Sequence, residues 1–292
     1  MTKKSLVFFV AVILFLPLVT SAHQPRLVKN NQIKVSNPEI SQAFYGELKG
    51  QPQEYSIFSA QPFRLYLGLL VPDISGAKTD ISVAVLSNGQ TLANLDGRNF
   101  KWMPYFEKFG GDAYLWGPEF SAADSNRTAG LKGQEMPAGN YIIKVSSPDN
   151  LGKYSLAIGD VENFPPREII NALYLVPQLK INFFAYPTLK LLSSIYIWLY
   201  LFFLYLLAFI FGLVYRYLLR KLAKVKSYKV KHNIGQSDKL IRAALAIGFL
   251  LVGIWLSFNP LLIFISGFCA FETIFSWCGF YAAIGKNSCP LN

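Results

Sequence analysis

The distribution of hydrophobic residues along the chain changes near residue 165, and the two parts predict different classes of structure. Before that point, apolar and polar positions alternate in short runs, at 62–72, 80–87, 140–147 and 153–159. Alternation with a period of two, interrupted by Asn-Gly, Asp-Gly and Pro-Asp-Asn-Leu-Gly, is typical of antiparallel strands joined by turns. Seven or eight such strands predict an all-β sandwich domain at residues 23–165.

A long run at 191–215 contains no Asp, Glu, Lys, Arg or Pro. Because roughly 20 apolar residues cross the hydrocarbon core of a bilayer, this run predicts a transmembrane helix, which we place at 191–218. Tyrosine and tryptophan residues lie at both ends of the run, as amphipathic rings do at membrane interfaces. Two further apolar runs, 240–258 and 261–284, predict an antiparallel membrane hairpin that turns at Asn259-Pro260.

Residues 1–22 have the pattern of a secretory signal peptide. Lys3 and Lys4 form a basic start, an apolar stretch follows, and Thr20 and Ala22 are the small residues expected before a cleavage site. An uncleaved anchor is the alternative, but the apolar stretch is short and contains Pro17. A signal peptide predicts that the sandwich domain lies outside the cytoplasm.

The formal charge of +11 is concentrated in one stretch of the chain. Residues 23–165 carry 13 Lys or Arg and 14 Asp or Glu, whereas residues 216–242 carry nine basic residues and one acid. Basic residues beside a membrane helix mark its cytoplasmic side, so this asymmetry explains the charge without a nucleic-acid partner. The predicted fold class is a multidomain membrane protein, with an extracytoplasmic all-β sandwich followed by three transmembrane α-helices. We expect a multi-pass protein of the cell (inner or plasma) membrane, in contact with the lipid bilayer, with its C-terminus inside.

Two connecting segments complete the predicted domain organisation. A basic cytoplasmic linker at 219–239 leads into the two-helix membrane hairpin at 240–292. A juxtamembrane segment at 166–190 is apolar but contains Pro177 and Pro187. We place this segment near the outer interface, where its aromatic side chains lie among lipid headgroups: Phe183, Phe184 and Tyr186. An ordinary linker packed on the sandwich explains the same sequence equally well.

Two motifs enclose the predicted hairpin. The opening motif contains Asn233, Gly235, Asp238 and Arg242, and the closing motif contains Cys278, Tyr281, Gly285 and Cys289. Together they resemble the YgaP-like inner-membrane domain of unknown function over residues 233–292. The chain departs from that family at Gly279, where proline is usual, and at Glu272, in a helix that is usually fully apolar. The resemblance implies a module for anchoring or for forming a homo-oligomer, and it implies no reaction.

The polar residues of the hairpin have simple expected roles. Asn233 or Asp238 can cap the start of a helix, while Lys239 and Arg242 lie at the level of the lipid phosphates. Glu272 lies near the middle of the final helix, where a charge costs at least about 2.5–3.5 kcal/mol. We therefore expect it to face another helix as a neutral acid. Its candidate acceptors are Ser257, Ser266, Ser276 and the same residue of a second copy.

All three cysteines, Cys269, Cys278 and Cys289, lie in the predicted hairpin, so the outer domain has no disulfide framework. No pair has the CxxC spacing of a zinc or redox site. Cys278 and Cys289 could approach each other as a thiol or metal site. Buried, reduced thiols in a helix interface are the simpler interpretation, and we favour it.

The outer domain offers little support for catalysis. His23 is its only histidine and it has no cysteine, so a nucleophile has no imidazole partner inside the fold. A copper site at His23 lacks a second histidine, because His232 lies across the predicted membrane. The acids Glu107, Asp112 and Glu119 are interpreted as scattered surface charges. We therefore expect no enzymatic activity, no metal and no cofactor.

Residues 99–120 are unusually rich in aromatic residues and show no clear period. A long aromatic insertion between strands is a candidate binding surface for an envelope protein or a glycan. Its predicted site residues are Trp102, Tyr105, Tyr114 and Trp116. The alternative, to which we give more weight, is that the rings fold back and cap the sandwich core.

The last two predicted strands of the outer domain, at 139–160, read GNYIIKVSSPDNLGKYSLAIGD. They resemble the closing hairpin of the prepeptidase C-terminal type of secreted β-sandwich. That resemblance implies a module that accompanies enzymes without being one.

The function favoured by the sequence is therefore non-catalytic. We expect a membrane-anchored envelope protein whose outer domain recognises or scaffolds, and whose hairpin serves anchoring or self-association. The alternative is a membrane accessory to thiol or sulfur chemistry at the cytoplasmic face, through Cys278 and Cys289.

Overall fold

The computed structural model describes residues 23–107, 111–123, 131–192, 195–222, 232–284 and 286–288. The chain divides into two compact units, Met1–Leu175 and Val176–Asn292, and each is described by itself. The predicted signal peptide and most of the predicted basic linker lie outside the described residues, as do Gly285 and Cys289.

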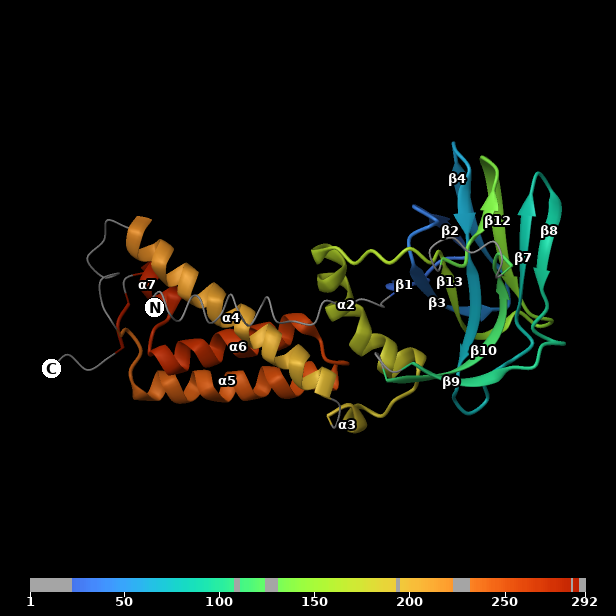
Figure 1. Ribbon diagram of the computed structural model, residues 1–292. Coiled ribbons are helices and arrows are strands. Elements are labelled where there is room, and N and C mark those ends of the chain that lie inside the picture. The colour runs from blue at the N-terminus through green and yellow to red at the C-terminus, as the bar shows by residue number, and fades with distance from the viewer. Residues whose placement is uncertain are drawn as a thin grey trace. The chain divides into compact units, whose positions relative to one another are not determined.

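The first unit is built from two main antiparallel sheets, each with one parallel edge pairing (Figure 1). The six-stranded sheet has the order β1 (Gln24–Leu27), β3 (Gln42–Lys49), β13 (Leu151–Ile158), β6 (Leu67–Pro72), β10 (Asp112–Phe120) and β9 (Met103–Glu107). The five-stranded sheet has the order β2 (Gln32–Val35), β4 (Gln53–Ser59), β12 (Gly139–Ser146), β7 (Ser82–Ser87) and β8 (Gln90–Leu95). A short pair, β5 (Phe63–Leu65) and β11 (Gln134–Met136), completes the unit.

The two sheets share one hydrophobic core, which makes the unit a β-sandwich. Alternate residues of β6, such as Leu67 and Leu69, and of β12, such as Ile143, are fully buried in a single cluster. Tyr55 of β4 and Tyr154 of β13 join their hydroxyl groups across this core at 2.7 Å. Because each buried hydroxyl has a partner, the two large rings fill the core without an unpaired polar group. The alternating runs of the sequence thus predicted the buried faces correctly.

The strand count and one strand pairing differ from the prediction. The described part of the unit contains thirteen strands rather than seven or eight, because several strands are only three or four residues long. The last two strands do not form a hairpin: β12 pairs with β4 and β7, whereas β13 pairs with β3 and β6. The chain crosses between the sheets at 147–150. Alternation identifies the face that each strand buries. It does not identify the sheet that the strand joins, because strands of both sheets bury one apolar face in the same core.

The predicted juxtamembrane segment is helical. It contains α2 (Pro166–Gln178), a π-helical turn η2 (Leu179–Phe183) and α3 (Thr188–Leu191). Pro177 does not interrupt α2, since it lies in the last turn of that helix. Phe183 and Phe184 are buried, which does not match the prediction that they lie among lipid headgroups.

The first turn of α2 is held against the edge strand β1. Arg26 donates to both carboxylate oxygens of Glu168, at 2.6 and 3.0 Å. The side chain of Asn171 donates to the carbonyl of Pro25 at 3.3 Å. The adjacent guanidinium group lowers the pKa of the Glu168 carboxyl group. This end of the segment therefore behaves as a linker packed on the sandwich, the second of the two expected arrangements.

The second unit contains four more helices. They are α4 (Ile195–Leu222), α5 (Gln236–Trp255), α6 (Pro260–Phe275) and α7 (Gly279–Ile284). Within the described residues, one stretch is long and apolar enough to cross a membrane, Ile197–Leu219 in α4. It overlaps the predicted span, although α4 continues four residues beyond residue 218.

The turn between α5 and α6 was predicted correctly. Asn259 caps α6, because its side chain accepts from the backbone N–H groups of Leu261 and Leu262, at 3.1 and 3.2 Å. Pro260 occupies the first turn of α6, where its missing N–H has no cost. Gly212 lets α4 approach α6 closely, since a Cβ atom at that position would lie 2.5 Å from the ring of Phe271.

The predicted final helix, 261–284, is in fact broken. α6 ends at Phe275, and Ser276 adopts a left-handed conformation with a φ of 49°. α7 begins three residues later, at Gly279. The break changes the surroundings of Glu272, which lies in the last turn of α6 rather than in the middle of a long helix.

Candidate functional site

The aromatic stretch of the outer domain forms two strands, β9 and β10, rather than an irregular insertion. Trp102 precedes β9 and caps the core, as the favoured alternative expected. Its indole N–H donates to the carbonyl of Gly97 at 2.8 Å, and its ring packs against the core cluster. A Cβ atom at Gly117 would lie 2.5 Å from this ring, so the glycine makes room for the indole. Trp102 therefore has a structural role.

Tyr114 is also removed from the surface. It is buried, and its hydroxyl lies 3.3 Å from that of Tyr45. Burial raises the pKa of Tyr114 and raises that of Tyr45 to about 12, so both phenols stay neutral at physiological pH. Asp112 is buried as well, which corrects the prediction that it is a surface acid.

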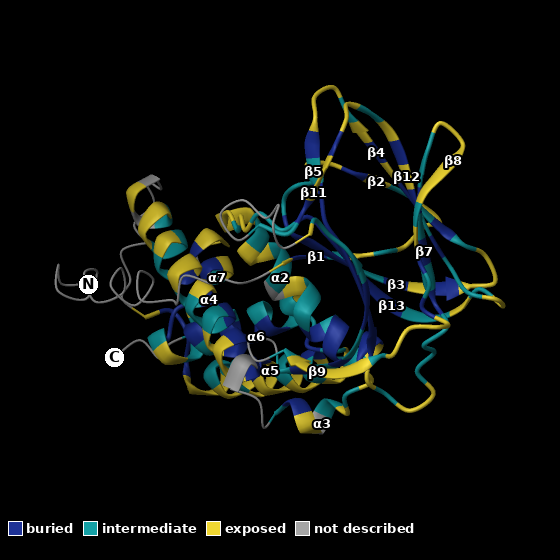
Figure 2. Cartoon of the chain, turned by 45° about the vertical axis from the view of Figure 1, so that its right-hand side comes forward, coloured by how far each residue is buried: buried dark blue, intermediate teal, exposed yellow. Residues whose placement is uncertain are grey.

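The other two predicted site residues lie together at the sheet edge. The rings of Tyr105 and Trp116 meet edge to face, with their centroids 5.0 Å apart. Lys132 places its ammonium group 5.8 Å from the Trp116 ring and 5.5 Å from the Tyr66 ring. The edge strand β9 is exposed along nearly its whole length, including Met103 at 53% and Phe106 at 60% (Figure 2).

We call Met103, Tyr105, Trp116 and Lys132 the edge surface; Phe106 is exposed on the opposite face of the sheet. Sequence reasoning found Tyr105 and Trp116 but missed the other two. The presence of Pro104 in β9 was an available signal, because proline in a sheet is found mainly on edge strands.

His23 does not belong to this surface. It hydrogen-bonds to Ser41, and burial lowers the pKa of its imidazole. Within the described residues, no group of three or more His, Cys, Asp and Glu side chains is arranged to hold a metal ion.

In the second unit, the structure brings the opening and closing motifs together. The side chain of Asn233 donates to the carbonyl of Cys278 at 2.9 Å and accepts from the backbone N–H of Cys278 at 2.7 Å. It does not cap α5 as predicted, because Gly235 occupies the N-cap position. The backbone N–H of Gly235 instead donates to Ser288 of the tail at 3.0 Å. The motif spacing therefore reflects contacts across the fold rather than local capping.

Asp238 takes part in the same connection. It accepts from the hydroxyl groups of Tyr281 and Ser288, which both come from the closing segment. The prediction that Asp238 caps a helix was therefore also wrong. Four residues of the two motifs, Asn233, Asp238, Cys278 and Tyr281, act as the pairing surface between the start of α5 and the region around α7.

Arg242 and Glu272 form a buried ion pair between α5 and α6. The second carboxylate oxygen of Glu272 accepts from the backbone N–H of Gly279 at 3.3 Å. Glu272 thus faces another helix as predicted, but its partner within the chain is a guanidinium group and not one of the expected serines. The guanidinium group stabilises the ionised carboxylate, whereas burial favours the neutral acid that was expected, so the two effects oppose each other at this side chain. Arg242, in turn, points into the helical unit rather than toward lipid phosphates.

The same guanidinium group contacts Cys278. Nη2 of Arg242 lies 3.1 Å from Sγ of Cys278, and the Arg242 guanidinium carbon lies 5.3 Å from the centre of the Tyr281 ring. Sγ also accepts from the backbone N–H of Tyr281 at 3.4 Å. Cys269 and Cys278 are both buried and not in disulfides, as favoured above, whereas Cys289 lies outside the described residues.

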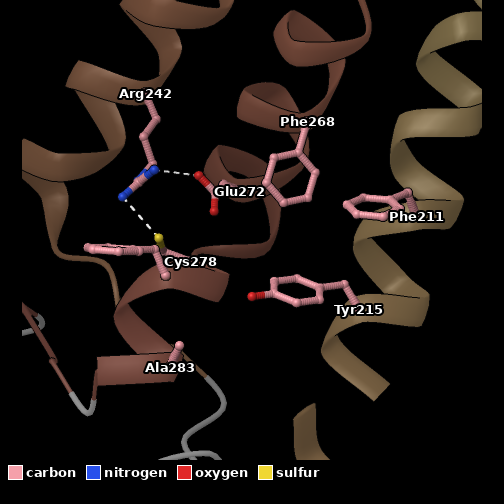
Figure 3. A pocket seen from close by; sticks show the side chains of 8 residues that line it. Phe211, Tyr215, Arg242, Phe268, Glu272, Cys278 and Ala283 are labelled. Carbon is pink, nitrogen blue, oxygen red and sulfur yellow. Dashed lines mark hydrogen bonds and ion pairs between the residues drawn. The ribbon is translucent and has the colours of Figure 1, made fainter. Parts of the chain in front are cut away.

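A pocket of about 660 Å³ opens beside this cluster (Figure 3). Figure 3 shows Arg242, Glu272 and Cys278 converging at one side of it, while Phe211 and Tyr215 of α4 and Phe268 of α6 lie across from them. Its remaining lining residues are Phe280 and Ala283 of α7. The pocket therefore combines a matched charge pair and a thiol with largely aromatic walls.

Comparison with known families finds a match for the last part of the chain, from α5 onward. Residues 230–292 match the transmembrane domain of the family described as inner membrane protein YgaP-like. The match confirms the resemblance seen in the two motifs. Among curated proteins, no relative matches the chain.

Solved structures show weak similarity to the sandwich. The pre-peptidase C-terminal domain of a collagenase from Bacillus anthracis matches at 10% identity and a TM-score of 0.23, covering 47% of this chain and 95% of that one. The catalytic domain of a GH87 α-1,3-glucanase, solved with tetrasaccharides, matches at 11% identity and a TM-score of 0.22. That match covers 41% of this chain and 22% of the glucanase. The sandwich assignment rests on the sheets and the core described above, because these scores are too low to carry it.

A double-mutant cycle tests the ion pair of this site. Arg242→Leu should lower the free energy of unfolding of the helical unit by about 3–5 kcal/mol, because it leaves a buried carboxylate without a counter-charge. Glu272→Leu should cost a similar amount. The double variant should recover most of the loss, because an apolar pair can replace a buried ion pair with little change in stability. Unfolding in mixed micelles, followed by hydrogen exchange of peptides from α5 and α6, measures each value. Additive losses in the double variant would contradict the pairing.

Proposed function

We propose that the chain is a multi-pass membrane protein whose β-sandwich lies outside the cytoplasm and recognises or scaffolds a partner there. The observation that carries this proposal is the position of α4, whose apolar stretch Ile197–Leu219 separates the sandwich from residues that match an inner-membrane family. The proposed role of the sandwich is non-catalytic, and the helical region anchors it.

The proposed orientation rests on charge. Nine basic residues and one acid lie between residues 216 and 242, which begin in the last turn of the apolar stretch of α4 and continue beyond it. Such an excess favours the cytoplasmic side. The proposed signal peptide at 1–22 favours the same orientation, because it would send the sandwich through the membrane first.

The proposed hairpin would place α5 and α6 in the bilayer as two further spans. α6 has 16 residues and is about 24 Å long, somewhat less than the hydrocarbon core of about 30 Å. Arg242 lies six residues after the start of α5, so it would lie about 9 Å from the cytoplasmic end of that helix. At that depth a paired charge costs less than at the centre of the bilayer.

The edge surface is the best candidate for recognition by the sandwich. The exposed ring of Tyr105 and the half-buried ring of Trp116 supply contact area at a low cost in conformational entropy, and Lys132 adds a charge beside them. An envelope protein or a glycan could use this chemistry. Trp102 and Tyr114 are not part of the proposed binding surface, because Trp102 packs against the core and Tyr114 is buried.

Thiol chemistry at Cys278 is the second candidate function. The specific observation that favours it is the contact between the Arg242 guanidinium group and Sγ of Cys278, beside a pocket. Arginine beside a cysteine stabilises the thiolate, which is the reactive form, and at Cys278 this contact acts against burial, which favours the neutral thiol.

Reporter fusions test the proposed topology. A reporter fused after Gly159 should be active only outside the cytoplasm, whereas one fused after Lys229 or Asn292 should be active only inside. The proposed signal peptide at 1–22 and the excess of basic residues at 216–242 both predict this result. Activity of the Gly159 fusion in the cytoplasm would overturn the proposed orientation.

Substitutions at the sheet edge test the recognition role. Tyr105→Ala combined with Trp116→Ala should abolish retention of the sandwich unit, expressed without residues 176–292, by a cell-envelope fraction while changing the stability of the sandwich far less than Trp102→Ala. Trp102→Ala should lower that stability by about 3–5 kcal/mol, the usual cost of removing a core aromatic side chain. Phe58→Ala, at an exposed position of β4, is the matched control and should change neither quantity. Unchanged retention of the double variant would remove the edge surface from the proposal.

A further inference from the structure

The pocket beside Cys278 has the parts of a reaction site for sulfur. Cys278 is the only nucleophilic thiol among the residues that line it. Sγ receives N–H groups from Arg242 and Tyr281, and the Glu272 carboxylate is bound to the same guanidinium group, so the thiol and the carboxylate lie side by side (Figure 3). A nucleophile beside a base, with donors that stabilise its anion, is the arrangement that activates a nucleophile for attack.

Charge in the pocket limits the ligands that it can take. The positive charge of Arg242 is matched by Glu272, and among the described residues no other charged side chain lines the space. A charged ligand would lose its hydration without gaining a counter-ion. Phe211, Phe268 and Phe280 instead offer aromatic surface to an uncharged molecule. A volume of about 660 Å³ is within the usual range for small-molecule sites.

We propose that this pocket binds small uncharged disulfides and that Cys278 exchanges with them, with Glu272 as the base. This inference rests on the second function proposed above, and it names the substrate class and the base. The exposed fraction of Cys278 is only 1%, so substrates would reach its sulfur through the pocket rather than from the surface.

The proposed step is a thiol–disulfide exchange. Sγ of Cys278 attacks one sulfur of the substrate while Glu272 accepts the thiol proton. A sulfur–sulfur bond forms between Cys278 and that sulfur, and the original sulfur–sulfur bond breaks. The departing sulfur leaves with the bonding electron pair and takes the proton from Glu272, giving a free thiol. Cys278 is oxidised to a mixed disulfide and the departing half of the substrate is reduced, so no further reactant is needed.

Dipyridyl disulfide is a suitable probe, because it is small and uncharged and releases a chromophore on exchange. The full chain with Cys269→Ser and Cys289→Ser, purified in detergent, leaves Cys278 as its only thiol. We expect one equivalent of chromophore and a mixed disulfide at Cys278 by mass spectrometry. A dianionic aromatic disulfide of similar size should react at least about tenfold more slowly, because it cannot be neutralised in the pocket.

Two variants in this background separate the roles of base and pocket. Glu272→Gln keeps the shape but cannot accept the proton, and it should slow the exchange by about tenfold or more. Ala283→Phe narrows the pocket from an exposed position and leaves both residues of the ion pair in place, and it should slow the exchange similarly. Retained thermal stability of Ala283→Phe shows that the slower reaction does not reflect unfolding.

The outcomes distinguish this inference from the function on which it rests. If Cys278 reacts at the same rate in Ala283→Phe, or equally fast with the dianionic disulfide, the proposed substrate site is wrong while a reactive thiol remains. If Cys278 reacts only after denaturation, both the inference and the thiol function fail. Neither result bears on membrane anchoring, which the reporter fusions test.

Discussion

The buried ion pair between Arg242 and Glu272 is the interaction on which the helical unit depends. Two charges removed from water are tolerated only when they satisfy each other and their remaining donors and acceptors find partners. Here the guanidinium group also contacts Sγ of Cys278 and the carboxylate also accepts from the N–H of Gly279, so that of the guanidinium nitrogens only Nε is buried without a partner among the described residues. The ion pair therefore constrains the end of α6, the break at Ser276 and the start of α7 together. The family motifs gain a physical meaning from this geometry, because Arg242 belongs to one and Cys278 to the other.

The break after α6 follows from the same set of contacts. Asn233 binds both the N–H and the carbonyl of Cys278, which a continuous helix would use within itself. The side chain of Asn233 thus replaces helical hydrogen bonds at the break, and the backbone groups there remain satisfied. The pocket lies where α7 turns away from the axis of α6, so the candidate site exists because the helix is interrupted.

Sequence reasoning predicted the parts of this protein that follow from periodicity and composition. The buried faces of β6, β7, β12 and β13 follow from alternation, and the apolar stretch of α4 follows from its length without a charge. It failed where long-range contacts decide the structure. Glu272 and Arg242 are 30 residues apart, and no local pattern pairs them. The pairing of β12 and β13 with strands from opposite sheets is equally invisible to alternation, because both strands bury one apolar face.

In the outer domain, too, composition predicted which residues are aromatic and concentrated, but not which of them are exposed. Tyr105 and Trp116 were found by composition, but only the sheet register places them beside Met103 and at an exposed edge. Trp102 and Tyr114 share that composition and are held by the core and by Tyr45. Aromatic content therefore predicts that a segment contains large contact surfaces, and the fold decides which of them face inward.

The central claim is that one membrane separates the sandwich from the helical motifs, and single-cysteine labelling tests it most directly. In a background without native cysteines, Phe58→Cys places a thiol on the exposed face of β4, and Lys286→Cys places one at the exposed end of the closing motif. A membrane-impermeant maleimide should label the first thiol in cells whose inner or plasma membrane is intact and can be reached by the reagent from outside. It should label the second thiol only after that membrane is permeabilised. Labelling of both thiols from the same side would contradict the account.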